Sequence, residues 1–92
     1  MALETTVFTF KISVPFSEWV KGFDSPEAAK MHESSGVTTL YRGISKNDPS
    51  SAVVVHQGEE GAAIKMFEGA RPIAEAAGHI WDSTIITSYL AN

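Results

Sequence analysis

The sequence predicts an α+β protein whose elements follow in the order strand, helix, strand, strand, helix, strand. Three observations support this order. An alternating apolar segment stands near the start, two neighbouring segments rich in β-branched residues stand in the middle, and two regions with helical apolar spacing flank this pair. Because 92 residues support only one hydrophobic core, we expect a single domain over residues 1–92.

The first third of the chain predicts one strand and two helical stretches. Over residues 5–14 the side chains alternate, and the apolar face carries Phe8, Phe10, Ile12 and Val14. Pro15 ends this strand. Residues 16–23 have helical spacing, and residues 24–27 supply a cap, a first-turn proline and an early acid for a second helix that begins near Pro26. We expect Gly36 to close it.

The rest of the chain predicts a hairpin, a helical region and a last strand. Residues 37–44 and 52–57 form two strands joined by the turn residues 45–50. Glu59 and Glu60 then stand where a helix N-terminus favours negative charge, before an apolar helical stripe at residues 62–67. After a break, a short helix at residues 73–77 ends at Gly78, and residues 79–89 form the last strand. Antiparallel pairing with the helices on one face gives a ferredoxin-like four-stranded sheet.

Composition and charge exclude several classes of partner. The net charge is -4 and the seven Lys and Arg residues are scattered, which argues against nucleic acid and against anionic membranes. The chain has no cysteine, hence no disulfide and no thiol nucleophile. No secretory signal is visible, and no apolar stretch approaches the ~20 residues of a membrane span. We therefore expect a cytoplasmic protein.

The strands carry apolar residues on both faces, which predicts a homodimer. Val53, Val54 and Val55 are consecutive, and the last strand contains both Ile85 and Ile86. Because successive strand residues point to opposite faces, part of this apolar surface is left uncovered by helices. A second copy packed on the open face of the sheet covers it. The alternative is a monomer with an apolar sheet face.

Several local sequences resemble a known superfamily. They are residues 16–19 (Phe-Ser-Glu-Trp), 23–24, 36–37, 41–43 (Tyr-Arg-Gly), 48–49 and 53–55. Together they resemble the dimeric α/β-barrel superfamily, which includes antibiotic-biosynthesis-type monooxygenases, and most closely an uncharacterised group of domains of unknown function from cyanobacterial genomes. The resemblance implies two four-stranded sheets closing into a dimeric barrel, with a pocket between sheet and helices. Its members include oxygenases, isomerases, haem-degrading enzymes and ligand-binding domains, so it does not decide the function.

Three histidines invite a metal hypothesis, because imidazole is a common metal ligand. The expected topology lets His32 and His56 approach each other but places His79 at the start of the last strand, at the other end. We therefore predict no metal site. A small site made by His32 and His56 with Glu33 or Glu59 is the weaker alternative.

A second group of residues predicts a ligand pocket. Aromatic and apolar residues of the first helical region and the last strand would line it, with one ionisable group and an arginine for an anionic ligand: Trp19, Phe23, Met31, His32, Arg42, His79 and Trp81. Core packing is the competing interpretation for the aromatic residues, and a surface ion pair for Arg42.

These residues support two functions, between which the sequence does not decide. The first is a small-molecule ligand-binding module. The alternative is a cofactor-independent enzyme of monooxygenase or isomerase type, acting on a small apolar or aromatic substrate, with His79 or His56 as the acid-base group. We expect no cofactor, and haem binding through His32 or His56 is disfavoured because no haem-attachment motif occurs.

Overall fold

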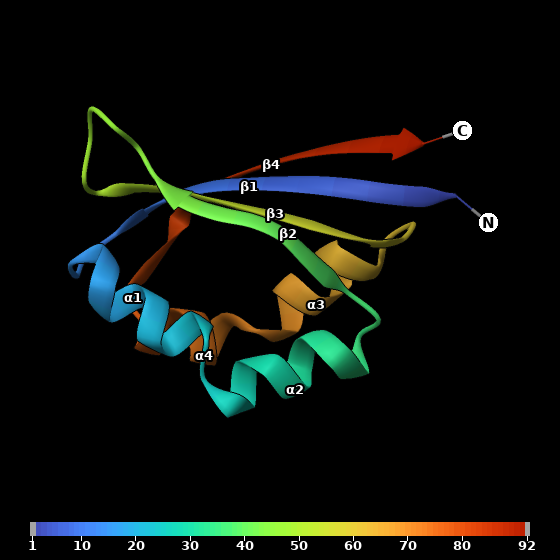
Figure 1. The fold of residues 1–92 in the computed structure, drawn as a ribbon, viewed down its shortest axis with the longest axis horizontal. Coiled ribbons are helices and arrows are strands. Elements are labelled where there is room, and N and C mark those ends of the chain that lie inside the picture. The colour runs from blue at the N-terminus through green and yellow to red at the C-terminus, as the bar shows by residue number, and fades with distance from the viewer. Residues whose placement is uncertain (1, 92) are drawn as a thin grey trace.

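The computed structural model describes residues 2–91, and its four strands form one antiparallel sheet in the order β2-β3-β1-β4. All helices lie on one side of this sheet (Figure 1). The order of strands and helices confirms the ferredoxin-like prediction. The elements are β1 (Leu3–Ile12), α1 (Phe16–Phe23), α2 (Pro26–Ser34), β2 (Thr38–Ile44), β3 (Ser51–Glu59), α3 (Ala62–Gly69), α4 (Arg71–Ala76) and β4 (His79–Ala91).

The core lies between the sheet and the helices. Alternate residues of β1 are buried, as the sequence pattern predicts, and they contact residues of α1, β3 and α3. The most buried members of this core are Phe8, Phe10, Ile12, Trp19, Ala52, Val54 and Ala63. No helix within residues 2–91 has both the length and the apolar character needed to cross a membrane.

Two element boundaries differ from the prediction for hydrogen-bonding reasons. The first strand ends at Ile12 and excludes Val14, because the Ser13 N–H donates to the Gly78 carbonyl and the chain turns toward α1. The acids Glu59 and Glu60 do not lie in the first turn of α3. That prediction was wrong, because β3 keeps pairing with β1 through Glu59 and the helix begins only after the left-handed Gly61.

A different acid occupies the start of α3. Glu4, at the beginning of β1, is only 8% exposed, and its Oε1 accepts a hydrogen bond of 2.8 Å from the Gly61 N–H. Carboxylates are favourable at this end of a helix because the first N–H groups are unpaired there. The N-terminal strand therefore supplies the anchor that the sequence pattern assigned to Glu59 and Glu60.

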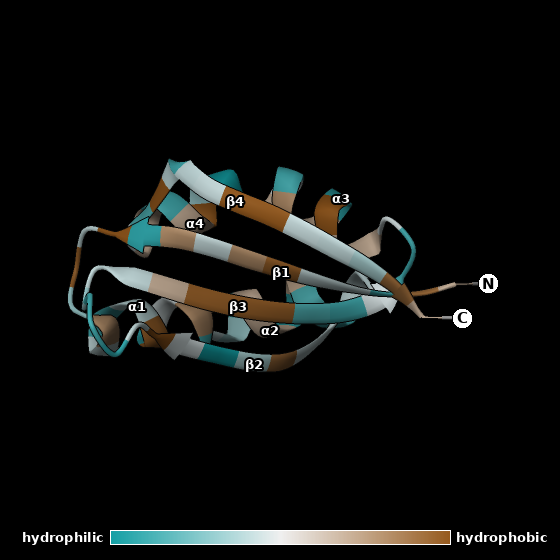
Figure 2. Ribbon diagram, turned by 90° about the horizontal axis from the view of Figure 1, so that it is seen from above, coloured by the Kyte–Doolittle hydropathy of each residue, from teal (hydrophilic) through white to brown (hydrophobic). Residues whose placement is uncertain are grey.

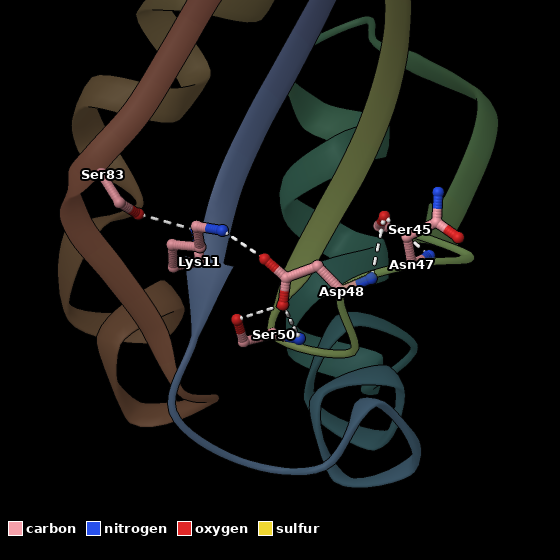
Figure 3. Close-up of polar contacts among 6 residues, drawn as sticks. All are labelled: Lys11, Ser45, Asn47, Asp48, Ser50 and Ser83. Carbon is pink, nitrogen blue, oxygen red and sulfur yellow. Dashed lines mark hydrogen bonds and ion pairs between the residues drawn. The ribbon is translucent and has the colours of Figure 1, made fainter.

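Strand β4 contains a large bulge that the sequence pattern did not predict. Lys11 pairs with Ile80 while Thr9 pairs with Ile85, so β4 has three more residues than β1 across this step. The Ser83 hydroxyl accepts a hydrogen bond of 2.7 Å from the Lys11 N–H (Figure 3) and donates one to the Ile80 carbonyl. The polar side chains thus satisfy the backbone groups that the bulge leaves without strand partners.

The loop between β2 and β3 is held by Asp48. The Lys11 Nζ donates to Asp48 Oδ2, and the Ser50 hydroxyl and N–H donate to Oδ1 (Figure 3). These hydrogen bonds, with that of Lys11 first, hold the pKa of Asp48 below its ordinary value. The turn predicted from residues 45–50 is thus joined to β1 by an exposed ion pair.

The other face of the sheet, here called the open face, carries apolar side chains from all four strands. Its apolar members are Val7, Tyr41, Val53, Val55, Ile85 and Tyr89, and Figure 2 shows the hydrophobic stretches of β1, β3 and β4 side by side. Ile85 is 66% exposed and Tyr89 is 61% exposed. The helices lie on the opposite face and leave this apolar surface uncovered.

Candidate functional site

A cavity of about 80 Å³ lies between the sheet and the helices and opens to the surface. Strands β1, β3 and β4 form one wall, and all four helices contribute to the other. The aliphatic part of the lining consists mainly of Met31, Val54, Met66, Ile73 and Ala74.

Seven aromatic rings of the lining form a closed circuit. Each ring contacts the next, with ring centroids 3.9 to 6.1 Å apart. Such separations are those of favourable aromatic pairs. In order, the circuit consists of His56, Phe8, Phe67, His79, Phe10, Trp19 and Phe23, which returns to His56.

Simple periodicities bring these rings together. Phe8 and Phe10 are two residues apart on β1, so both point to the helix side of the sheet. Trp19 and Phe23 are four residues apart on α1, so they lie on the same helix face and stack at 4.9 Å. Phe67 comes from α3. The circuit therefore forms only when the strands and the helices that carry these rings pack in their observed positions.

His56 lies on β3, next to Thr39 of the neighbouring strand β2. Its Nδ1 is 3.1 Å from the Thr39 hydroxyl, and the residue is only 5% exposed. Burial, with a smaller contribution from His32, lowers the pKa of His56 to about 4. The ring is therefore neutral at pH 7, and one of its nitrogens remains without a protein partner among the described residues.

His79 begins β4 and stacks on Phe10, with the ring planes 9° apart and the centroids 3.9 Å apart. Its Nε2 is 2.7 Å from the hydroxyl of Thr84, a residue of the β4 bulge. Burial lowers the pKa of His79 to about 4, although Glu75 opposes this effect. A second neutral imidazole thus faces the cavity.

His32, in the last turn of α2, is half-buried at the mouth of the cavity. Its ring centroid lies 5.1 Å from that of His56 and 5.2 Å from that of Phe23. Burial also lowers the pKa of His32. His32 and Phe23 additionally line a neighbouring surface groove with Tyr41 and Arg42, so these two rings border both the cavity and the groove.

The comparison with protein families decides where the chain belongs. The family model described as "Domain of unknown function (DUF3764)" matches residues 3–91. The chain is a member of the DUF3764 family. The likeness to a group of domains of unknown function, noted in the sequence, is thereby confirmed, and none of the curated proteins matches this DUF3764 protein.

Solved structures share the fold of this DUF3764 protein at low sequence identity. A monooxygenase from the gene ActVA-Orf6 of Streptomyces coelicolor, in complex with Nanaomycin D, has a TM-score of 0.70 and 15% identity, over 99% of this chain and 88% of that one. SnoaB, a cofactor-independent oxygenase from Streptomyces nogalater, has a TM-score of 0.59 and 14% identity, over 100% and 93%. At such identities the likeness shows the ferredoxin-like fold alone.

The structure brings five of the seven predicted pocket residues of this DUF3764 protein to the cavity: Trp19, Phe23, Met31, His32 and His79. Arg42 lies outside, where its Nη2 is 2.7 Å from Asp24 Oδ2. Trp81 stacks on Phe67 at 4.2 Å without lining the cavity. The Trp81 ring also lies 5.6 Å from that of His79, so Trp81 is on the helix side of the sheet, as its two-residue spacing from His79 predicts, but outside the cavity lining.

Sequence reasoning assigned some of the cavity lining to the core alone. Phe8 and Phe10 are core residues by pattern, and Phe67 belongs to an apolar helix stripe. Their spacing shows burial but carries no sign of a cavity, because a cavity depends on how side chains from different elements fail to fill a shared space.

The described part of the chain contains no complete ligand set for a metal ion. His32 and His56 approach each other as expected, but residues 2–91 contain no group of three or more His, Cys, Asp or Glu side chains arranged to hold a metal ion. Neither Glu33 nor Glu59 completes such a group.

Proposed function

We propose that this DUF3764 protein binds a small, planar, largely apolar molecule in the aromatic cavity. The observation that carries the proposal is the closed circuit of seven rings, two of which are neutral histidines. Apolar walls with a few polar atoms at fixed places are typical of ligand sites. Flat aromatic walls favour a flat ligand, because stacked and edge contacts then cover both of its sides.

The size of the cavity limits the ligand. Its volume of about 80 Å³ is below the ~300 Å³ at which drug-sized pockets begin. We propose that a single ring is enclosed and that larger ligands extend through the mouth into the groove beyond Phe23 and His32. The ligand carried by the Streptomyces coelicolor monooxygenase supports ligand binding in this fold without identifying the ligand here.

A pair of variants on α4 tests the proposal. Ala74 lines the cavity, whereas Ala76, on the same helix, is exposed and does not. Filling the cavity with Ala74→Leu should weaken binding of toluene or phenol by at least about tenfold, and Ala76→Leu should leave it unchanged. The measurement is an NMR titration that follows the Trp19 indole N–H. Equal affinities for the two variants, or no shift in the wild type, would contradict ligand binding at this site.

Catalysis is the second candidate, and the histidines favour it. His56 and His79 are unprotonated at pH 7 and line an apolar cavity, so either ring can accept a proton in a cofactor-independent oxygenase or isomerase, although the lowered pKa makes both weak bases. Oxygen uptake with 1-naphthol, lost in His79→Gln while binding persists, would distinguish an oxygenase from a binding module.

We also propose that two copies associate through the open face. All four strands place apolar side chains on it, and the most exposed of them lie on β2 and β4. Exposed apolar patches of this kind usually mark partner surfaces. A second copy is the simplest partner because the same surface is then covered on both chains. The cytoplasmic location expected from the sequence stays a prediction.

A further inference from the structure

The bulge in β4 places a threonine hydroxyl on a histidine of the cavity. Thr84 follows the extra residues of the bulge, and its Oγ1 lies 2.7 Å from His79 Nε2. The same hydroxyl donates a hydrogen bond of 2.8 Å to the Trp81 carbonyl. Thr84 therefore joins the imidazole to the backbone of the strand that carries it.

These two hydrogen bonds determine which ring nitrogen holds the proton. A hydroxyl has one hydrogen, and the Trp81 carbonyl can only accept, so the hydrogen of Thr84 is directed to that carbonyl. The Thr84 oxygen must then accept from His79, which requires a proton on Nε2.

We infer that Thr84 holds His79 in the Nε2–H form and so presents the cavity with an unprotonated Nδ1. Because the ring is neutral at pH 7, a proton on Nε2 leaves Nδ1 with a free lone pair. Thr84 is thus a positioning residue that acts through His79. The inference rests on the proposed function only where it concerns the ligand.

The free nitrogen faces open space. Nδ1 of His79 has no hydrogen bond within residues 2–91, and yet this region contains no fully buried side-chain nitrogen or oxygen that lacks a partner. Nδ1 must then be accessible, although His79 as a whole is only 7% exposed. Because His79 lines the cavity, we infer that the cavity is the space onto which Nδ1 opens.

His56, the other buried histidine of the cavity, is not held in one tautomer in this way. Thr39 approaches His56 Nδ1 at 3.1 Å, but its hydroxyl makes no second hydrogen bond among the described residues, so either group can donate. The tautomer of His56 is therefore not imposed. It follows that the cavity has a fixed acceptor only at the His79 end, and that a ligand should place an O–H or N–H donor there.

The tautomer is measured directly by nitrogen NMR of the histidine rings at pH 7. In the wild type, His79 should show a protonated Nε2 and an unprotonated Nδ1. Thr84→Ser keeps the hydroxyl and should preserve this state, whereas Thr84→Val should give a mixture of tautomers. Thr39→Val is the matched control and should leave His79 unchanged. A protonated Nδ1 or a mixture in the wild type would overturn the inference, whatever the variants do.

A pair of near-isosteric probes tests the consequence for ligands. Phenol offers a donor and toluene does not, so the wild type should prefer phenol, and Thr84→Val should reduce this preference by roughly fivefold to tenfold. If neither probe binds while His79 shows the expected tautomer, the ligand proposal fails and the tautomer stands. If both bind with an unchanged ratio in Thr84→Val, the role of Thr84 is refuted and the cavity remains a binding site.

Discussion

At the scale of single residues, the two buried histidines make the stability of the fold depend on pH. Their ordinary pKa of 6.5 falls to about 4 in the folded protein because burial disfavours the charged ring. The unfolded chain therefore binds protons first as the pH falls. The stabilisation from the neutral rings is fully present above pH 6.5 and is lost as the pH falls toward 4.

We accordingly expect the free energy of unfolding to decrease between pH 6.5 and 4, by at most about 1.4 kcal/mol per pH unit for each histidine, with the steepest fall midway between the two pKa values. Urea unfolding at a series of pH values measures it. The double variant His56→Gln/His79→Gln should have a flatter profile in this window. A profile equally steep in the variant would assign the acid sensitivity to other groups.

At the scale of elements, Glu4 joins the first strand to the third helix. Its carboxylate is nearly buried and accepts the Gly61 N–H. Glu4→Ala should lower the free energy of unfolding by about 1–2 kcal/mol, because it leaves that N–H without its partner. Glu60→Ala is the control, since Glu60 is exposed, and should change stability by less than about 0.5 kcal/mol. Equal urea midpoints for the two variants would show that the contact adds no stability.

The helices and strands also show which structural features the sequence pattern could predict and which it could not. Helical spacing and caps predicted α1 at its observed bounds and the start of α2, because these signals are local. The bulge in β4 was missed, because it depends on sheet pairing that brings the Lys11 N–H to the Ser83 hydroxyl, and on the hydrogen bond that the Thr84 hydroxyl donates to the Trp81 carbonyl. The run of polar residues 82–84 inside an apolar strand is the only sequence sign of it. The sequence predicted a pocket and part of its lining. The remaining rings of the cavity could not be distinguished from core residues by their spacing.

At the scale of the whole molecule, the open face is where the proposed dimer is tested. Val55 lies near its centre, paired with Val7 on one side and Tyr41 on the other. Val55→Glu should convert a dimer to a monomer, because an unpaired carboxylate at the centre of an apolar interface is costly to bury. Light scattering after gel filtration gives the mass. Ala29→Glu, on exposed α2, should remain dimeric, and a monomeric wild type would contradict the dimer.

The pairing of β1 with β4 affects when the cavity forms during folding. Leu3 pairs with Ala91, and Thr6 and Ser88 share a hydrogen bond, so the two ends of the described chain lie side by side. Contacts between residues so distant in sequence form late, since a long loop must close first. His79 and its bulge belong to β4, which enters the sheet only through this long-range pairing with β1. A chain in which β4 has not yet paired therefore holds most of the aromatic rings but no complete site, and ligand binding would report on the formation of this pairing.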